Sequence, residues 1–294
     1  DASDYKQYIF PLMFFKRLSD VWDEDYREAF EETSDVGYAT ATANDRFAVP
    51  EGSHWKDVRA ASTDVGREIL SAFQEIEKSN PERLQGVFGN AQWTDKGQMP
   101  DATLKNLIEH FSKHDLSLGA VPEDELGNGY EYLIKKFADD SGHTAQEFYT
   151  NRTLVHLMAQ MLEPQPGEDV YDPTCGTGGM LISCLAEVKR SGGDTRTMGL
   201  YGQELINITA AIARMNLVIH GVSDFQIASG NTLSDPAFVA GDKLRTYDIV
   251  LANPPYSIKK WNRDAWTSDA WGRNFLGTPP QGRADYAFFQ HILN

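Results

Sequence analysis

The first part of the chain places apolar residues at the three- and four-residue spacing of α-helices. The longest such pattern covers residues 5–32, where apolar side chains share one stripe and the end is strongly acidic. The same spacing predicts three further helices, at 63–78, 101–113 and 126–138. Asp101 is the expected N-cap of the second of these, and the Gly-, Thr- and Ala-rich stretch with Pro50 predicts a loop. We therefore expect an all-α domain over residues 1–140.

Downstream the pattern changes to short apolar runs that alternate with helical spacing. Strands are predicted at 168–171, 198–203, 225–228 and 247–252, and helices at 179–189, 206–220 and 284–294. Strands that alternate with helices form βαβ units, in which helices cover a parallel sheet on both faces. The fold class predicted for residues 141–294 is therefore α/β, with a doubly wound, mainly parallel sheet. Four strands would leave such a sheet unfinished, so we also expect a longer natural chain whose C-terminal part is missing from these 294 residues.

The charge of the chain limits what it binds alone. It carries 27 Lys and Arg residues against 43 Asp and Glu residues, which gives a formal net charge of -16. Proteins that grip nucleic acid unaided usually present a basic face, because counterion release supplies most of the non-specific affinity. We therefore expect that any activity on DNA or RNA needs a partner that supplies much of the binding affinity. The acidic end of the first helix fits either a solvated face or a surface that docks a basic partner.

Cysteine, histidine and apolar stretches exclude other classes. The two cysteines, Cys175 and Cys184, exclude a disulfide framework and favour a reducing cytoplasm. The seven histidines are scattered, and none is paired with another His or Cys at ligand spacing, so no metal site is expected. The longest apolar stretch, Tyr8–Leu18, falls short of the roughly 20 residues that a membrane span needs, so no membrane partner is expected either.

The first candidate site is a Gly-rich loop between the first strand of the predicted sheet and its helix. Ligands bind in such sheets at the carboxyl ends of the strands, and glycines let the backbone approach the ligand closely. The helix N-terminus favours a carboxylate or phosphate. The acid before the loop suits an ammonium group, such as that of the methionine moiety of S-adenosylmethionine. The alternative is a tight turn without a ligand. The candidate residues are Asp172, Gly176, Thr177, Gly178 and Gly179.

Two further segments extend this site along the sheet. Glu204 ends the second strand, where an acid of an α/β nucleotide fold accepts hydrogen bonds from ribose hydroxyls. The alternative for Glu204 is an exposed residue at a strand end. Asn231 and Thr232 follow the third strand, in a loop that would lie beside the adenine ring of the same cofactor.

The most specific motif follows the fourth strand and consists of Asn253, Pro254, Pro255 and Tyr256. An exocyclic amino nitrogen conjugated to a ring is a weak nucleophile, and acceptors around its hydrogens make its lone pair more available. The Asn253 side-chain oxygen and the Pro254 carbonyl can act as such acceptors, because the prolines fix the turn and leave carbonyls unpaired. Tyr256 offers a flat face on which an extruded base stacks. The motif therefore predicts methyl transfer to an amino group.

These motifs resemble those of amino-group DNA methyltransferases, and the wider sequence resembles the modification (methylation) subunit of type I restriction–modification systems. Three further stretches carry the narrower resemblance: EFYTNR at 147–152, YIFPLMFFKRLSD at 8–20 and RADYAFF at 283–289. The resemblance covers nearly the whole chain. It implies the fold of S-adenosylmethionine-dependent methyltransferases and transfer of a methyl group to the N6 amino group of adenine, with the target base rotated out of double-stranded DNA.

The resemblance also assigns residues and partners. Carried over by position, the cofactor contacts are Glu147, Phe148, Tyr149, Thr150, Asn151, Arg152, Thr177, Gly178, Gly179 and Glu204, and the adenine clamp is Asn253 to Tyr256. The implied partners are a specificity subunit that reads the DNA sequence, a second methylation subunit and a restriction subunit. Two positions depart from the pattern, because Asn151 stands where a proline is usual and Asn231 where several relatives carry Asp.

Three alternatives stay open on the sequence. A protein-glutamine or RNA N-methyltransferase would suit the same clamp, because a side-chain amide is also a planar amino group. The chain could instead be an assembly module that does not turn over. Cys175 could act as a nucleophile, but Thr174 separates it from the proline that cytosine-C5 enzymes place directly before their cysteine, so we interpret it as a packing residue.

Overall fold

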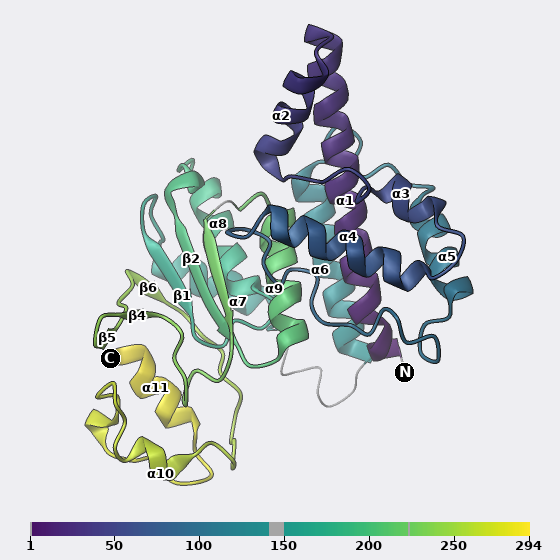
Figure 1. The fold of residues 1–294 in the computed structure, drawn as a ribbon. Helices are drawn as coiled ribbons and strands as arrows, with labels where there is room; N and C mark the ends of the chain where they lie inside the picture. The colour runs from purple at the N-terminus through teal and green to yellow at the C-terminus, as the bar shows by residue number, and fades with distance from the viewer. Residues whose placement is uncertain (1, 141–149, 223) are drawn as a thin grey trace. The chain divides into compact units, whose positions relative to one another are not determined.

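The computed structural model describes residues 2–140, 150–222 and 224–294. The chain divides into two compact units, Asp1–Leu133 and Ile134–Asn294 (Figure 1). Within the described ranges, no helix is long and apolar enough to cross a membrane.

The first unit is built from helices, as expected. In chain order they are α1 (Ala2–Thr33), α2 (Val36–Arg46), α3 (Trp55–Ala60), α4 (Val65–Ser79), α5 (Asp101–Phe111) and α6 (Glu123–Asp140), the last of which runs past the end of the unit. The prediction of a loop before Pro50 is wrong, because α2 lies there. Asp35 caps α2 by accepting a hydrogen bond from the Tyr38 N–H at 3.0 Å. The small side chains of Ala39 and Ala43 are buried and let α2 pack closely on α1.

A second correction concerns α5. Asp101 is its first residue, and the N-cap is Pro100, which has no side-chain hydrogen bond. The Asp101 carboxylate instead accepts from the Asp64 backbone N–H and pairs with Lys96, both at 3.3 Å. Its side chain therefore links the start of α5 to the start of α4.

The acidic end of α1 has two parts. The Glu24 carboxylate is buried and accepts hydrogen bonds from the backbone N–H groups of Leu118 (2.7 Å) and Gly119 (2.9 Å), so it fixes a loop of the same unit. Glu28, Glu31 and Glu32 are exposed. The run is therefore a structural anchor at Glu24, while its last turns are exposed and still fit either a solvated face or a docking surface.

The second unit contains the predicted parallel sheet. Its strands are β1 (Asp169–Asp172), β2 (Gly199–Glu204), β3 (Phe225–Ser229) and β6 (Ile249–Val250), hydrogen-bonded in the order β3-β2-β1-β6 and all parallel. A two-stranded antiparallel ribbon, β4 (Val239–Ala240) and β5 (Lys243–Leu244), stands apart from it. Strand β6 is shorter than predicted. The Asp248 carboxylate accepts the Asp169 backbone N–H at 2.9 Å, in place of a backbone partner, so the ladder begins at Ile249.

The two faces of the sheet follow from the alternation of side chains along β1 and β2. Val170 and Leu200 lie in one core with helices α7 (Arg152–Leu162), α8 (Gly179–Arg190) and α9 (Asn207–Ile219). On the other face Tyr171 and Tyr201 both pack against Tyr247. The Tyr171 hydroxyl lies 3.2 Å from the His291 ring of α11 (Asp285–Leu293). Helical elements thus lie against both faces, which confirms the predicted fold class.

The connection order places a ligand crevice. The chain moves from β1 outward through β2 to β3 and then crosses to the other side of β1 with β6 (Figure 1). In open α/β sheets, ligands bind outside the carboxyl ends of the strands where this reversal occurs. Here the loops after β1 and after β6 meet at that point, and these are the loops that carry the glycines and the Asn-Pro-Pro-Tyr motif. The short elements η2 (Thr195–Thr197), α10 (Arg263–Trp266) and η3 (Asn274–Leu276) complete the unit.

Candidate functional site

The loop after β1 has a fixed conformation that its glycines allow. Gly178 is the N-cap of α8 with a φ of 81°, a left-handed conformation that other residues adopt only with strain. Asp172 is 1% exposed, and its Oδ1 accepts from the Thr174 N–H at 2.9 Å, which turns the chain away from the strand. Asn216, fully buried on α9, donates through Nδ2 to the Thr177 carbonyl at 2.9 Å. The loop is therefore fixed by hydrogen bonds to Asp172 of β1 and Asn216 of α9.

Glu204 at the end of β2 is hydrogen-bonded to the same loop. Its Oε2 accepts from the Gly176 N–H at 3.1 Å, and its Oε1 accepts from the Ile206 N–H at 2.9 Å. Each carboxylate oxygen has a further lone pair, so these two bonds leave room for hydroxyl donors. The sequence did not reveal that this predicted ribose acceptor also clamps the Gly-rich loop.

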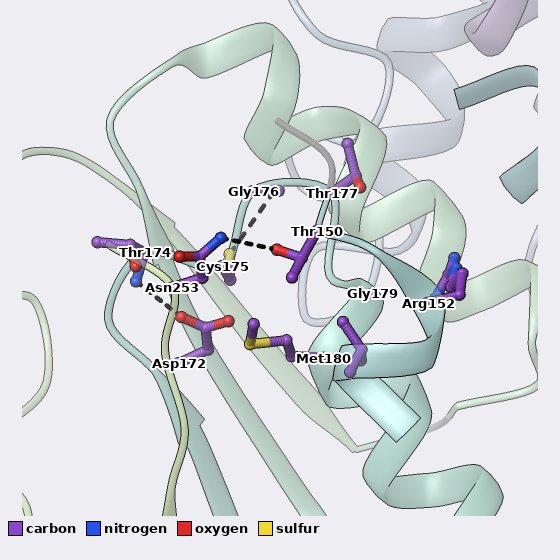
Figure 2. A pocket seen from close by; sticks show the side chains of 11 residues that line it. Thr150, Arg152, Asp172, Thr174, Cys175, Gly176, Thr177, Gly179, Met180 and Asn253 are labelled. Carbon is purple, nitrogen blue, oxygen red and sulfur yellow. Dashed lines mark hydrogen bonds between the residues drawn. The ribbon is translucent and has the colours of Figure 1, made fainter. Parts of the chain in front are cut away.

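Seven of the predicted residues line one cavity at the end of β1, which we call the loop cavity (Figure 2). They are Thr150, Arg152, Asp172, Gly176, Thr177, Gly179 and Asn253. Thr174 lines it as well, and its buried hydroxyl oxygen has no hydrogen-bond partner among the described residues. A buried polar atom without a partner costs free energy, so this hydroxyl is suited to a ligand.

The loop cavity has charges of both signs. Burial raises the pKa of Asp172 to about 7, and the nearby charge of Glu204 adds to the rise, while the Thr174 N–H opposes it. Burial also raises the pKa of Glu204. The Arg152 guanidinium lies at the N-terminus of α8, where a Cβ on Gly179 would come within 3.2 Å of its Nη1. A ligand with a cationic group for the acids and a carboxylate for Arg152 and the helix N-terminus would fit this distribution.

The acceptor corner, which we define as Asn253 to Tyr256, lies across the cavity from the glycines. The Asn253 amide is held on both sides. Its Nδ2 donates to the Thr150 hydroxyl oxygen at 3.1 Å (Figure 2), and its Oδ1 accepts from the Tyr256 hydroxyl at 2.6 Å. The Thr150 bond turns the amide so that the oxygen faces away from α7. A substrate amino group that binds Asn253 Oδ1 must therefore share this oxygen with the Tyr256 hydroxyl or displace the hydroxyl.

A second cavity, the corner cavity, lies on the other side of Asn253. Four more predicted residues line it, namely Glu204, Asn231, Thr232 and Pro255, together with Asn253. The Thr232 hydroxyl donates to the Pro173 carbonyl at 2.6 Å, which ties the loop after β3 to the loop after β1. Asn231 Oδ1 accepts from the Leu233 N–H at 2.9 Å and shapes the turn. The two loops thus form one continuous wall.

Some predicted residues line neither cavity. Asn151 caps α7 by accepting from the Thr153 N–H at 2.9 Å, which is a structural role for the residue that departs from the family pattern. Gly178 packs against Ala213, and neither Pro254 nor Tyr256 is among the residues that line the two cavities. Glu147, Phe148 and Tyr149 lie outside the described residues. The roles assigned to all these residues stay predictions.

The structure adds residues that sequence reasoning missed. Val155 and Met180 line the loop cavity, and Lys260, Trp261 and Phe288 line the corner cavity. A sequence signal for Lys260 and Trp261 was present, because a basic pair and a tryptophan begin three residues after the Asn-Pro-Pro-Tyr motif, as in nucleic-acid sites that combine cations with aromatic rings. The hydrophobic residues on α7 and α8 gave no signal that separates them from core.

Cys175 is buried, in agreement with its interpretation as a packing residue, and it also lines the loop cavity. It is 5% exposed, burial raises the pKa of its thiol, and its Sγ would lie 2.8 Å from a Cβ placed on Gly202. A thiol that resists ionisation is a poor nucleophile. Among the described residues, no group of three or more His, Cys, Asp or Glu side chains could hold a metal ion.

Comparison with known proteins gives consistent matches along the chain. A family model described as N-6 DNA Methylase matches residues 121–294, and one described as HsdM N-terminal domain matches residues 1–111. The methylase subunit of the type I restriction enzyme HindI of Haemophilus influenzae is 33% identical over 240 residues, which are 78% of this chain and 51% of that protein. The MjaIX methylase subunit of Methanocaldococcus jannaschii is 26% identical over 316 residues, covering 100% of this chain and 55% of the relative.

A solved structure supports the same relationship. The methyltransferase subunit of a type I restriction-modification system from Streptococcus thermophilus superposes with a TM-score of 0.78 at 27% identity, covering 100% of this chain and 67% of that one. The chain spans about half the length of the curated relatives that it matches. Since the N-6 DNA Methylase model covers more than half of the residues, including both loops of the site, the chain belongs to the N-6 DNA methylase family.

Proposed function

We propose that this chain transfers a methyl group from S-adenosylmethionine to the N6 amino group of adenine in DNA, as the methylation subunit of a type I restriction–modification complex. The observation that carries the proposal is the position of Asn253. Its side chain lines the same cavity as Asp172 and the Gly-rich loop, and it lines the corner cavity as well. A methyl donor that spans the two cavities would pass this side chain, and an amino acceptor bound to Asn253 would meet the methyl group there.

The two cavities together fit the proposed cofactor. Asp172 and Arg152 suit the ammonium and carboxylate of a methionine moiety, and the Thr174 hydroxyl offers a buried polar atom without a partner. Glu204, with Asn231 and Thr232 beyond it, suits the ribose and the adenine. S-adenosylmethionine, when bound, supplies a methyl group on a positively charged sulfur. Two buried carboxylates with raised pKa values would favour that charge.

Positioning would supply most of the catalysis. Asn253 Oδ1 and the Pro254 carbonyl accept the hydrogens of the adenine amino group, which aims the nitrogen lone pair into the loop cavity. Bound S-adenosylmethionine would supply the methyl group to this nitrogen, with its sulfur leaving as a neutral thioether and one proton lost from the nitrogen. No covalent bond to the protein is needed, so the effective concentration and orientation of the two groups set the rate. Tyr256 offers its exposed ring for stacking on the rotated base.

The charge of the chain supports a partner in DNA binding. A net charge of -16 repels the phosphate backbone, so a specificity subunit that grips and reads DNA would have to bring this chain to its target. The named relatives are methylase subunits of type I restriction enzymes. We extend this to the chain: a specificity subunit, a second methylation subunit and a restriction subunit are its proposed partners.

The test is methyl transfer by the natural full-length protein, coexpressed with its specificity subunit. Tritiated S-adenosylmethionine is incubated with DNA from a host that lacks adenine methylation, and the products are digested and separated as nucleosides. Label in N6-methyladenine supports the proposal. Label in a protein glutamine or in RNA, with none in DNA, would replace it with one of the alternatives. Calorimetry with S-adenosylmethionine tests the cofactor separately, and the absence of binding heat at several temperatures would contradict it.

A further inference from the structure

A third concave surface lies next to the acceptor corner, between the loop at 276–280 and helix α11. We call it the outer groove. Its volume is about 780 Å³, and Tyr256 lies at its edge, with Leu276, Pro280, Arg283, Tyr286 and Phe289 along it. The segment that forms it is drawn in yellow and yellow-green in Figure 1. Because Tyr256 belongs both to this groove and to the acceptor corner, whatever fills the groove continues from the proposed target site.

The walls of the outer groove are fixed by hydrogen bonds from the side chains of α11. Gln290 of α11 is 2% exposed, its Oε1 accepts from the Leu276 N–H at 2.8 Å, and its Nε2 donates to the Gly277 carbonyl at 3.0 Å. The Asp285 carboxylate accepts from the Ser257 N–H at 2.8 Å. These bonds attach the loop at 276–280 and Ser257, the residue after the acceptor corner, to one helix, so the groove keeps a defined shape.

Aromatic rings stand exposed along this groove. Tyr286 and Phe289 are 60% and 52% exposed, and they lie three residues apart on one face of α11. Tyr256, at 76% exposed, is the third ring of the set. Exposed rings in a row are typical of single-stranded nucleic-acid sites, because each base stacks on a flat face without regard to sequence.

The segment that forms the outer groove and the acceptor corner has a positive net charge, whereas the whole chain has a negative one. Residues 251–294 carry five Lys and Arg residues and three Asp residues, whereas the whole chain carries 27 basic and 43 acidic residues. Arg283 lines the outer groove, and its Nη1 donates to the Ser257 hydroxyl oxygen at 3.4 Å. Lys259 is exposed beside the same corner. Arg283 and Asp285 both line the outer groove, and the segment around it carries a small excess of positive charge, so it repels an anionic polymer less than the rest of the chain does.

We propose that the outer groove binds the nucleotides that flank the target adenine, with their bases stacked on Tyr286 and Phe289 and a phosphate beside Arg283. The inference rests on the proposed function. It goes beyond it by assigning a second DNA site, which holds the strand open next to the rotated base. A protein partner would use the apolar area of these rings, whereas a nucleic acid would use their flat faces and the charge of Arg283.

The test uses the natural full-length protein with the subunits that copurify with it. Tyr286→Leu and Phe289→Leu, made together, keep apolar area but remove the flat rings, and Arg283→Gln removes the charge. Phe275→Ala and Arg196→Gln are matched controls, since Phe275 is equally exposed but does not line the groove and Arg196 lies outside this segment. For each variant we would measure the affinity for S-adenosylmethionine, the subunit composition, and kcat and KM for unmethylated DNA across a salt series.

We expect the double variant to raise the KM for DNA roughly tenfold or more, because each stacked base contributes to binding and about 1.4 kcal/mol corresponds to tenfold. Arg283→Gln should lower the slope of log affinity against log salt by about 1, as expected for one phosphate contact. Cofactor affinity, subunit composition and both controls should match the wild type.

Three outcomes would overturn the inference. Unchanged KM and salt slope in folded variants would leave the groove without a role in DNA binding. Loss of a subunit from the complex in either variant would make the groove a protein docking site. A wild-type protein that binds S-adenosylmethionine but methylates no DNA would remove the proposed function and this inference together, whereas active variants with a wild-type KM would remove the groove alone.

Discussion

The cofactor half and the acceptor half of the site are built in opposite ways. Around the loop after β1 the side chains are buried acids, and backbone N–H groups satisfy them, as at Asp172 and Glu204. Beside the acceptor corner three aromatic side chains, Tyr256, Tyr286 and Phe289, are exposed, and residues 251–294 carry more basic than acidic side chains. One half is suited to a small cation that enters a fixed cavity, and the other to a large anion that approaches from solvent.

This difference separates the expected effects of substitutions. Changes in the cofactor half should alter the affinity for S-adenosylmethionine and its pH dependence. Changes at the acceptor corner should alter kcat or the KM for DNA while cofactor affinity stays constant. Asn253 and Thr150 lie at the border, because both line the loop cavity and the two are hydrogen-bonded to each other. They test the comparison most sharply.

The largest effect is expected for Asn253→Ala. Removal of one preorganised hydrogen-bonding group at a reacting atom costs about 100- to 1,000-fold in kcat in other enzymes, and we expect a loss of this size in methyl transfer. The affinity for S-adenosylmethionine should change less than about threefold, since the buried acids and the Gly-rich loop remain. Labelled transfer and calorimetry measure the two. Wild-type kcat in the variant would show that the amide oxygen does not hold the amino group.

The next effect is expected for Asp172→Asn. Because burial raises the pKa of Asp172 to about 7, this carboxyl is half protonated at neutral pH in the absence of a cationic ligand. A ligand ammonium group binds the charged form, so the affinity for S-adenosylmethionine should fall about tenfold per pH unit below 7 and level off above it. Asp172→Asn should weaken binding at pH 8 by about tenfold or more, the size of a charge-assisted hydrogen bond, and should abolish this pH dependence.

The same substitution predicts a change in stability with a fixed sign. The folded protein holds the Asp172 proton more tightly than the unfolded chain, so the free energy of unfolding falls as the pH rises from about 4 toward 7. Asp172→Asn removes this loss. The variant should therefore melt at a higher temperature than the wild type at pH 8, with a difference that shrinks at lower pH. A variant that melts lower at pH 8 would contradict the burial of a charged Asp172 there.

A third, smaller effect is expected for Thr150→Val, which keeps the shape but removes the oxygen that accepts from Asn253 Nδ2. The Asn253 amide would then turn more easily, and kcat should fall about fivefold, since one hydrogen bond contributes about 1 kcal/mol. Thr150→Ser should restore kcat, and Thr153→Val, on the exposed side of α7, serves as the control. If the affinity for S-adenosylmethionine falls instead, Thr150 contacts the cofactor as the family resemblance implies, and its action through Asn253 is refuted.

The positions of the two halves could be predicted from the sequence, but their connection could not. The loops after β1 and β6 follow buried strands, and carboxyl ends of parallel strands share one edge, so Asp172 and Asn253 had to lie close together. The Thr150–Asn253 bond joins residues that are 103 positions apart and depends on a side-chain rotamer, which no pattern encodes. The exposure of Tyr286 and Phe289 was likewise hidden, because apolar residues occupy both faces of α11.

The features that the sequence analysis did not predict, such as α2 and the role of Arg273, also depend on contacts between residues far apart in the sequence. Helix α2 has a weakly apolar sequence and folds because two alanines pack on α1, a tertiary effect that overrides local propensity. Arg273 reads as a surface residue but is 1% exposed, pairs with Asp269 at 2.6 Å, and donates to the carbonyls of Thr232 and Leu233 at 2.8 Å. Arg273 thus holds the loop after β3, which lines the corner cavity, although the two are 41 residues apart in the sequence. Only the folded structure reveals this contact.

The smallest effect is expected for Tyr256→Phe, which separates the ring of Tyr256 from its hydroxyl. The hydroxyl donates to Asn253 Oδ1 at 2.6 Å, so it competes with the substrate amino group for this oxygen in the protein without DNA. Its removal leaves Asn253 Oδ1 more accessible but less well oriented, and these effects oppose each other, so kcat should change by no more than about threefold, near the net value of one exposed hydrogen bond. Tyr256→Ala should instead raise the KM for DNA about tenfold through lost stacking. Stopped-flow measurement of methyl transfer in both variants separates the role of the ring from that of the hydroxyl. Equal defects in Tyr256→Phe and Tyr256→Ala would mean that the acceptor half presents the hydroxyl, and not the exposed ring, to DNA.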